Sequence, residues 1–344
     1  MEQAVVARAP LRIPLGGGGT DLPSHYLAHG GFAVSATIDR HVHVLLSTAF
    51  ARRFRLKHLE WEDVETPAEI RHPILRAAVE NHWDGTPFEL ASVGDVPPGT
   101  GLGSSSAYTL AVLQALATAG GERLSPEQLA VRACRLEIEH LAQSIGVRDQ
   151  YAIAVGGVTA VELAADDGSA APDRSGDPAA EVLAAATVHR LAVSHATVRA
   201  LDERLLLFFA GERPPGARML APIVEGAADS AMARNLRRTG DLAREVAAAL
   251  EAGDLDGVGA SMAEQWALKR ARTPAAVTDR IAELHAAAIG PGRATGAVLA
   301  GAGGGGFLLA HSVDPDATRA ALAAVGAPEL RFAIEPRGCS AGPA

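Results

Sequence analysis

The sequence has few of the features that mark secreted or membrane proteins. It contains two cysteines, Cys134 and Cys339, which lie far apart and show no metal-ligand spacing. A reduced, cytoplasmic setting is therefore expected instead of a disulfide framework. Its apolar runs, such as residues 205–210, fall far short of the roughly 20 residues that span a bilayer. No membrane partner is therefore expected.

The chain also lacks an excess of basic charge and a leader pattern. A formal net charge of −9 argues against nucleic acid as the main partner. The first residues, Met-Glu-Gln, show no basic region followed by an apolar run, so no secretory signal is expected. The 12 histidines are scattered, without a His-x-x-x-His pair beside a carboxylate. A structural zinc site is therefore not expected.

The 344 residues are 48% hydrophobic and only 4% aromatic, which is typical of a soluble globular protein. That length suits two domains of roughly 150 residues each. The pattern changes from strands with glycine turns to helices near residue 195. We therefore expect an N-terminal domain over residues 1–195 and a C-terminal domain over residues 196–344.

Two segments carry the capping-box pattern that opens a helix. Residues 66–69 read Thr-Pro-Ala-Glu and predict a helix that runs to about residue 83. Residues 125–128 read Ser-Pro-Glu-Gln and predict a second helix that ends near Gly146. Helical patterns predict further helices over residues 107–119, 241–252, 254–272, 275–289 and 314–325.

Short runs rich in β-formers predict the strands. Residues 32–38 and 41–48 are interpreted as a hairpin that turns at Asp39 and Arg40. Residues 166–178 hold almost nothing to bury and predict a mobile surface loop. Further strands are expected over residues 4–8, 88–93, 158–163, 191–198, 205–210, 307–311 and 330–334. Because strands and helices mix without regular alternation, the pattern predicts an α+β protein.

Three glycine-rich loops lie at residues 16–21, 99–106 and 301–306. Any one of them could be a tight turn, but glycine loses more backbone entropy on folding than any other residue. The middle loop runs from a strand through Gly-Leu-Gly into three serines that begin a helix. Free backbone N–H groups and the helix dipole would face this loop, which predicts a phosphate site. It is neither a Walker A loop nor a dinucleotide fingerprint, since no Gly-Lys-Ser/Thr follows and the glycine spacing differs.

The middle loop, Pro-Pro-Gly-Thr-Gly-Leu-Gly-Ser-Ser-Ser-Ala at residues 97–107, resembles the second motif of the GHMP kinases, which include galactokinase, homoserine kinase and mevalonate kinase. The outer loops resemble the other motifs in the right order: Arg-Ala-Pro-Leu-Arg at residues 8–12 with residues 16–21, and residues 301–306. The resemblance implies a two-domain α+β fold with the nucleotide site between the domains. The residues that it implies for ATP binding are Pro98, Gly99, Gly101, Leu102, Gly103, Ser104, Ser105, Ser106, Gly303 and Gly304.

Within the family, Gly-Gly-Gly-Thr-Asp-Leu at residues 17–22 and Arg-Asp-Gln-Tyr-Ala at residues 148–152 resemble the D-glycero-D-manno-heptose 7-phosphate kinases. This resemblance implies phosphorylation of a heptose 7-phosphate at the anomeric O1, which gives a heptose 1,7-bisphosphate. Arg213 and Arg218 are basic candidates for the substrate phosphate. The residues taken as substrate-binding are Gly17, Gly18, Gly19, Thr20, Asp21, Lys269 and Arg270.

Asp149 is expected in a loop ahead of a strand, where it could be an ordinary turn residue. The resemblance places it on the catalytic aspartate of the family, which orients the acceptor hydroxyl and takes its proton. Arg12 lies nine residues before Asp21, as in the galactokinase pattern. An arginine there could stabilise the transferring phosphoryl group or lower the pKa of the nearby carboxylate, and the alternative is a solvated strand end.

The expected cofactor is Mg²⁺, and either Glu137 or Glu139 could supply its carboxylate. On a 3.6-residue helix, Glu137 falls at the edge of the apolar face, whereas Glu139 falls opposite, where Arg135 can pair with it. A carboxylate on an apolar face needs a partner or a metal, although a base could also satisfy Glu137. The resemblance also places the metal-binding glutamate at Glu137, and Ser105 is the second expected ligand.

Several alternatives share these motifs. The chain could be another GHMP kinase, of the fucose, galactose, homoserine or mevalonate type, or a decarboxylase of a diphosphorylated acid. It could also be a non-catalytic sugar-binding regulator on the same fold. Asp149, Arg12, Glu137 and Ser105 are all present, which argues against the regulator. The expected partners are a sugar phosphate and ATP, and a homodimer is left open.

Overall fold

The computed structural model describes residues 4–165, 186–213, 219–226 and 230–344. The surface loop predicted at residues 166–178 and the candidate Arg218 lie outside these ranges. None of the described helices is long and apolar enough to cross a membrane.

The described strands form one large and one small sheet. In the large sheet, β11, β1, β2, β5, β3 and β4 follow one another, and β6 and β7 continue from the other part of β2. In the small sheet, β10 lies between β8 and β9. The large-sheet strands are β1 (Val5–Gly16), β2 (Gly31–Ser47), β3 (Phe54–Lys57), β4 (Trp61–Val64), β5 (Glu89–Gly94), β6 (Val158–Leu163), β7 (Ala186–Arg190) and β11 (Ser340–Pro343). The small-sheet strands are β8 (Leu205–Gly211), β9 (Ala294–Leu299) and β10 (Gly306–Ser312).

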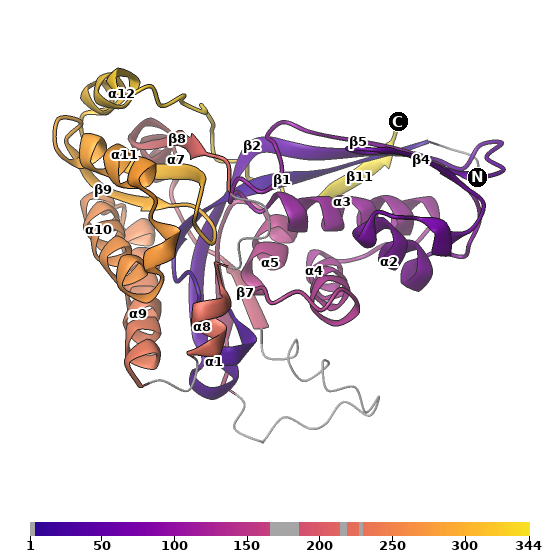
Figure 1. The fold of residues 1–344 in the computed structure, drawn as a ribbon, viewed down its shortest axis with the longest axis horizontal. Helices are drawn as coiled ribbons and strands as arrows, with labels where there is room; N and C mark the ends of the chain where they lie inside the picture. Colours follow the sequence, from indigo (N-terminus) through magenta and orange to yellow (C-terminus); the bar gives the residue numbers. More distant parts are fainter. Residues whose placement is uncertain (1–3, 166–185, 214–218, 227–229) are drawn as a thin grey trace.

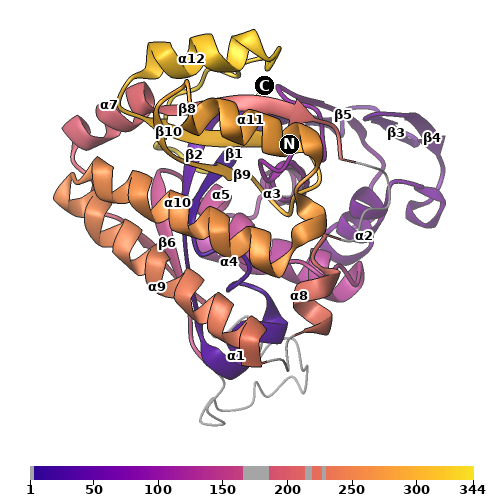
Figure 2. The ribbon, with the colours of Figure 1, turned by 60° about the vertical axis from the view of Figure 1, so that its left-hand side comes forward.

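Helices cover one face of the large sheet and gather around the small one. Figure 1 shows α2 to α5 beneath the large sheet and α9 to α12 at one end of it. Figure 2 shows α9 and α10 side by side, and α9 also packs on β1 and β2. The N-terminal helices are α1 (Pro23–His29), α2 (Pro73–His82), α3 (Ser104–Ala119), α4 (Pro126–Arg135) and α5 (Arg148–Val155). The others are α7 (His195–Arg204), α8 (Ala221–Glu225), α9 (Ser230–Ala252), α10 (Leu255–Arg272), α11 (Asp279–Ile289) and α12 (Pro315–Ala324). Single turns of other helix types are η1 (Pro67–Glu69), η2 (Leu136–His140) and η3 (Pro274–Ala276).

The central helix α3 positions the middle glycine loop. Its side chains are apolar or small on nearly every side, so it can be buried all round. It packs against both β1 and β2, and Leu110, Ala111 and Val112 are fully buried. The middle of α3 therefore lies in the core, whereas Ser105 in its first turn is exposed.

The predicted hairpin at residues 32–48 is wrong, because β2 is one continuous strand. Its first half pairs with β6 and its second half with β5. Asp39, at the junction, forms no turn: its backbone N–H donates to Ala333 and its carboxylate accepts from the same residue. The hydrogen bonds of Asp39 are therefore made with a distant segment, which the local sequence does not indicate.

Other boundaries also differ from prediction. The capping box at Thr66 is present, but it opens only η1, because His72 precedes a proline and adopts extended geometry that starts α2 anew. The helix from residue 126 gives way to a π-helical turn after Arg135 and does not continue to Gly146. The strand expected at residues 191–198 is replaced by α7, which Ser194 caps. Residues 330–334 form only an isolated bridge.

The last strand returns to the N-terminal part of the chain. β11 pairs antiparallel with β1, from Val5 opposite Pro343 to Arg8 opposite Ser340. Glu335 also donates its backbone N–H to Thr37. Residues 340–343 therefore complete the sheet of the N-terminal part. The division into two domains at residue 195 stays a prediction.

Candidate active site

Three loops meet at one cleft of about 280 Å³. The middle loop and the C-terminal loop touch backbone to backbone. A Cβ atom on Gly101 would lie 2.5 Å from the carbonyl oxygen of Ala300, and one on Gly301 would lie 2.6 Å from the Cα of Gly101. Gly103 precedes α3 with a φ of 77°. The glycines therefore bring two main chains together beside the N-terminus of α3.

Replacing Gly101 with alanine is expected to destabilise the protein more than the same change at Gly99. The φ angles are similar, at 85° and 78°, so the left-handed strain of about 1–2 kcal/mol is common to both. Nothing lies within 4 Å of a Cβ on Gly99, whereas Ala300 blocks one on Gly101. The unfolding free energy of Gly101→Ala, measured in urea, should be lower than that of Gly99→Ala by at least about 1 kcal/mol. Equal losses would contradict the close approach of the loops.

Arg12 on β1 connects Asp149 to the middle loop. Its Nε and Nη2 donate to the two carboxylate oxygens of Asp149 at 2.7 and 2.5 Å, and its Nη1 donates to the carbonyl of Gly101 at 2.8 Å. Asp149 lies in the first turn of α5, not in the loop that was predicted. Burial would raise the pKa of Asp149, but the charges of Arg12 and Arg148 outweigh burial and lower this pKa to about 2. The carboxylate is therefore ionised throughout the neutral range.

Glu137 is fully buried in η2, below the first turn of α3. Its carboxylate accepts hydrogen bonds from Ser105 and Ser106, both at 3.1 Å, and from Thr109 and Gln150. Burial raises its pKa, and these hydrogen bonds only partly offset the effect. Glu139 is more exposed and lies 3.9 Å from Arg135. The predicted difference in burial between the two glutamates is confirmed.

The first glycine loop holds Asp21 at the other side of the cleft. The Asp21 carboxylate accepts from the backbone N–H of Gly19 at 3.1 Å and lies 3.8 Å from Nε of Arg148. A Cβ on Gly146 would lie 2.0 Å from Asp21 Oδ2, so only glycine leaves room for this carboxylate. Asp21 and Asp149 therefore both lie close to Nε of Arg148.

The described residues place five basic side chains around the cleft against three carboxylates. Burial, and then the charges of Arg272 and Arg148, lower the pKa of Lys269, while burial and the charge of Arg148 lower that of Arg272 to about 10. Burial is the larger cause of both shifts, and the neighbouring cations add to it; an anion in the cleft would offset both effects. The basic residues are Arg12, Arg148, Arg213, Lys269 and Arg272, and the acidic ones are Asp21, Glu137 and Asp149.

The structure brings most of the predicted site residues to this cleft. Arg270 lies elsewhere: it is exposed and lines a separate surface hollow, because it points away from the face of α10 that carries Lys269. Lys269 reaches the cleft, but its Nζ donates to the carbonyls of Leu299 and Gly301. The predicted residues that line the cleft are Arg12, Gly18, Gly19, Asp21, Gly99, Gly101, Gly103, Ser104, Ser105, Ser106, Glu137, Asp149 and Lys269. The predicted residues Gly17, Thr20, Pro98, Leu102, Gly303 and Gly304 are not among its lining residues and belong to the supporting loops.

Sequence reasoning missed Arg148 and Arg272 as site residues. Arg272 donates to the carbonyl of Gly18 at 2.8 Å, and Nη1 of Arg148 lies 3.4 Å from where a Cβ on Gly18 would be. A helical signal was present for Arg272: Gln265, Lys269 and Arg272 follow the i, i+4, i+7 spacing of one helix face, and all three line the cleft. Arg148 offered no such pattern.

The fold and the site combine a glycine loop at the N-terminus of α3, the buried carboxylate of Glu137 and the ion pair of Arg12 and Asp149. The description "GHMP kinases N terminal domain" matches residues 72–157, and "GHMP kinases C terminal" matches residues 246–328. The chain belongs to the GHMP kinase family. The predicted family and α+β fold are confirmed.

Individual relatives cover the chain unevenly. The D-glycero-alpha-D-manno-heptose 7-phosphate kinase of Campylobacter jejuni is 29% identical over 173 residues, which cover 47% of this chain and 51% of that protein. The bifunctional fucokinase/GDP-fucose pyrophosphorylase of Arabidopsis thaliana is 24% identical over 330 residues, which cover 89% of this chain and 30% of that protein. The chain thus spans about half of the first of these curated relatives and less than a third of the second.

A solved structure shares the whole fold. The D-glycero-D-manno-heptose 1-phosphate kinase from Bacteriodes thetaiotaomicron superposes with a TM-score of 0.76 at 19% identity, and the match covers 99% of each chain. At this identity the likeness establishes the fold, and the substrate has to be argued from the site.

Proposed function

We propose that this protein is an ATP-dependent sugar kinase that phosphorylates a heptose 7-phosphate at O1 to give a heptose 1,7-bisphosphate. The observation that carries the proposal is the bridge made by Arg12, which binds both the Asp149 carboxylate and the carbonyl of Gly101 in the phosphate loop. It joins the group that would hold the acceptor hydroxyl to the loop that would hold the donor phosphates. The similarity to a heptose 7-phosphate kinase over 47% of the chain supports the choice of sugar.

Asp149 would act mainly by position and charge. A carboxylate with a pKa of about 2 has little affinity for a proton, so it accepts a hydrogen bond from the acceptor hydroxyl and fixes its direction. Arg12 holds that carboxylate in place and adds positive charge beside the transferred group. Positioning and electrostatic stabilisation then provide catalysis without a covalent intermediate.

Mg²⁺ would be held by Glu137 and Ser105. Both side chains line the cleft, and their oxygens lie 3.1 Å apart. Carboxylate and hydroxyl oxygens are the hard ligands that Mg²⁺ prefers, and a buried carboxylate with a raised pKa gains by facing a cation, so the residues fit. The ion would neutralise charge on the β- and γ-phosphates of ATP. Without it, Ser105, Ser106, Thr109 and Gln150 keep this carboxylate hydrogen-bonded.

The two glutamates provide a matched test of the Mg²⁺ site. Glu137→Gln should raise the Mg²⁺ concentration for half-maximal activity at least about tenfold, because a neutral amide is a poor ligand for this ion. Glu139→Gln should leave that concentration unchanged and alter stability by no more than about 0.5 kcal/mol. A titration of activity with Mg²⁺ measures both. The reverse pattern would assign the ion to Glu139.

The phosphate of the sugar would bind between Arg148 and Arg272. Among the described residues, Nη1 of Arg148 and Nε of Arg272 are buried without a hydrogen-bond partner. Buried N–H groups without partners are rare and unfavourable, and a phosphate dianion accepts bonds from guanidinium groups strongly. Both groups lie at the Gly18–Gly19 turn, where the absence of side chains leaves room. Arg213, which donates to the carbonyl of Gly303, lies nearer the C-terminal loop.

The decisive assay is incubation of the pure chain with Mg-ATP and heptose 7-phosphate, followed by NMR of the product. A new phosphate on O1 is expected, together with one ADP for each sugar consumed. Fucose, galactose, homoserine and mevalonate form the comparison panel, and CO₂ release would indicate the decarboxylase. Absence of ADP release with every acceptor would favour the sugar-binding regulator. The cytoplasmic setting and the homodimer stay predictions.

A further inference from the structure

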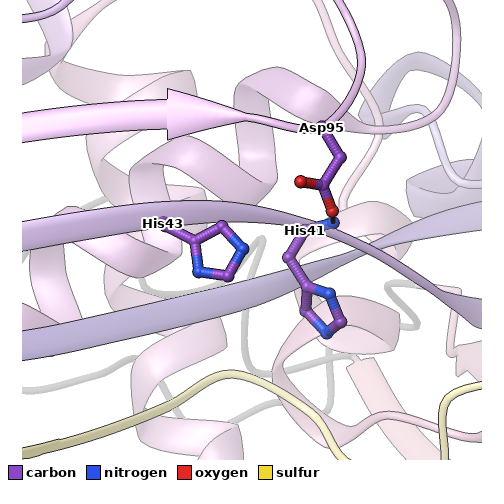
Figure 3. A group of neighbouring side chains, drawn as sticks. All are labelled: His41, His43 and Asp95. Carbon is purple, nitrogen blue, oxygen red and sulfur yellow. Dashed lines mark hydrogen bonds between the residues drawn. The ribbon is translucent and has the colours of Figure 1, made fainter.

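Two histidines and an aspartate gather on the large sheet, outside the cleft. His41 and His43 are two residues apart on β2, so they project from the same face of the strand. Asp95 directly follows β5, the neighbouring strand. Figure 3 shows the two imidazoles side by side with the Asp95 carboxylate next to them. One ligand atom of each residue lies within 4.8 Å of the others.

We infer that His41, His43 and Asp95 form a binding site for a divalent transition-metal ion, with zinc as the best match. Zinc takes imidazole nitrogens and carboxylate oxygens, and sites with three protein ligands keep a fourth position open to water. Ligand atoms of a tetrahedral zinc site stand roughly 3.3 Å apart, so small side-chain rotations would close the present spacing. Mg²⁺ would not replace zinc here, because it prefers a set of oxygen ligands.

The surroundings hold two of the ligands in place. The Asp95 carboxylate accepts a hydrogen bond from the backbone N–H of His41 at 2.8 Å, which the dashed line in Figure 3 marks. Nε2 of His41 lies 3.7 Å from a carboxylate oxygen of Glu335. Metal-binding histidines commonly direct their second nitrogen to a carboxylate, so Nδ1 of His41 is the nitrogen left for the ion. Arg8 pairs opposite His43 on β1. Its positive charge lies near the ligands and would oppose the binding of a cation.

The His-x-x-x-His spacing is not the one that these two histidines share. That spacing places two histidines on one face of a helix, whereas a strand needs the His-x-His spacing found at residues 41–43. Asp95 comes from the next strand and its backbone N–H donates to the carbonyl of His41. It also stands two residues before Pro97, where the middle glycine loop begins. An ion at this site would therefore fix the point at which the chain leaves β5 for the phosphate loop.

The test is a zinc titration of the full chain after treatment with a chelator, followed by calorimetry and by the absorption of Co²⁺ in place of zinc. We expect one ion per chain at this site. His43→Asn should weaken binding at least about 100-fold, because losing a ligand exceeds the 10- to 100-fold effect of losing an outer partner. Zinc should raise the melting temperature of the wild-type chain but not that of His43→Asn.

Two control variants separate this site from other zinc binding. His195→Asn removes an exposed histidine of α7 and should leave zinc affinity unchanged. Glu137→Gln removes the carboxylate proposed for Mg²⁺ and should also leave zinc binding intact. No saturable binding by the wild-type chain would overturn the inference. So would equal affinities of the wild-type chain and His43→Asn, or loss of zinc in Glu137→Gln alone.

Discussion

Asp149→Asn is expected to lower turnover by roughly 10²- to 10⁴-fold, because the acceptor hydroxyl loses the charged carboxylate that positions it. Asparagine keeps the size of the side chain but loses the charge that pairs with Arg12 and Arg148. The amide oxygen of asparagine can still accept a hydrogen bond, but the acceptor hydroxyl would lose the negative charge beside it, while the glycine loop at residues 99–106 stays intact. Single-turnover rates and ATP binding by calorimetry measure the two effects separately, and ATP affinity should change little.

The thermal stability of Asp149→Asn is the necessary control, since the change leaves Arg12 without its carboxylate partner. Rates are therefore compared below the melting temperature of the variant. Turnover close to that of the wild-type chain would remove Asp149 from the chemistry. A large loss of ATP affinity with normal turnover at saturation would move its role to the nucleotide.

The same carboxylate makes a prediction about pH. Its pKa is about 2 in the folded protein and about 3.9 in an unfolded chain. A lowered pKa means that its contribution to stability is fully present above about pH 4 and is lost as the pH falls towards 2. Titration of Asp149 should therefore leave the rate unchanged between about pH 5 and 8. Any acid limb in that range that disappears in Asp149→Asn would contradict the low pKa.

Heptose 7-phosphate should be preferred over the unphosphorylated sugar by at least about 10²-fold in kcat/KM, a difference of ~2.7 kcal/mol. Arg272→Gln should reduce this ratio towards about 10, because charge-assisted bonds to phosphate contribute about 1.5–3 kcal/mol each. The ratio of the two substrates is the measurement, since it cancels effects on folding and on ATP. Arg148 is less suited to the test, because it also pairs with Asp149.

Arg270→Ala is the matched control on the same helix. Its side chain is exposed and lies outside the cleft, so its substrate ratio should equal that of the wild-type chain. A lower substrate ratio in Arg270→Ala than in Arg272→Gln would instead assign the substrate phosphate to Arg270, as the sequence predicted. Equal use of galactose or fucose without phosphate by the wild-type chain would reject the heptose and leave the broader kinase proposal.

Local patterns predicted the parts of the site that depend on one element. The helical face correctly predicted that Glu137 is buried and Glu139 is not. The segment is π-helical, but the wider turn does not bring Glu139 to the buried side. The glycine loop before α3 was also predicted from a single local segment. Its features of strand, glycines and serine-rich helix start are consecutive in sequence.

What failed depends on segments that meet only in the folded chain. The hairpin at Asp39 was wrong because Ala333 supplies the hydrogen bonds that replace a turn. Arg148 and Arg272 come from α5 and α10, and only the packing of the two halves brings both guanidinium groups to the Gly18 turn. The charge and spacing of residues within one segment do not indicate that Arg148 and Arg272 lie at the same loop.

The pairing of β11 with β1 has a consequence for the order of events during synthesis. The N-terminal sheet presents the outer edge of β1, from Val5 to Arg8, until residues 340–343 have left the ribosome. An uncovered strand edge can pair with other chains, and it does so most readily in partly folded states. More than 330 residues, those between Arg8 and Ser340, must therefore be made before this edge is closed. The strand edge is thus open throughout synthesis of the intervening chain and is closed once β11 pairs with β1.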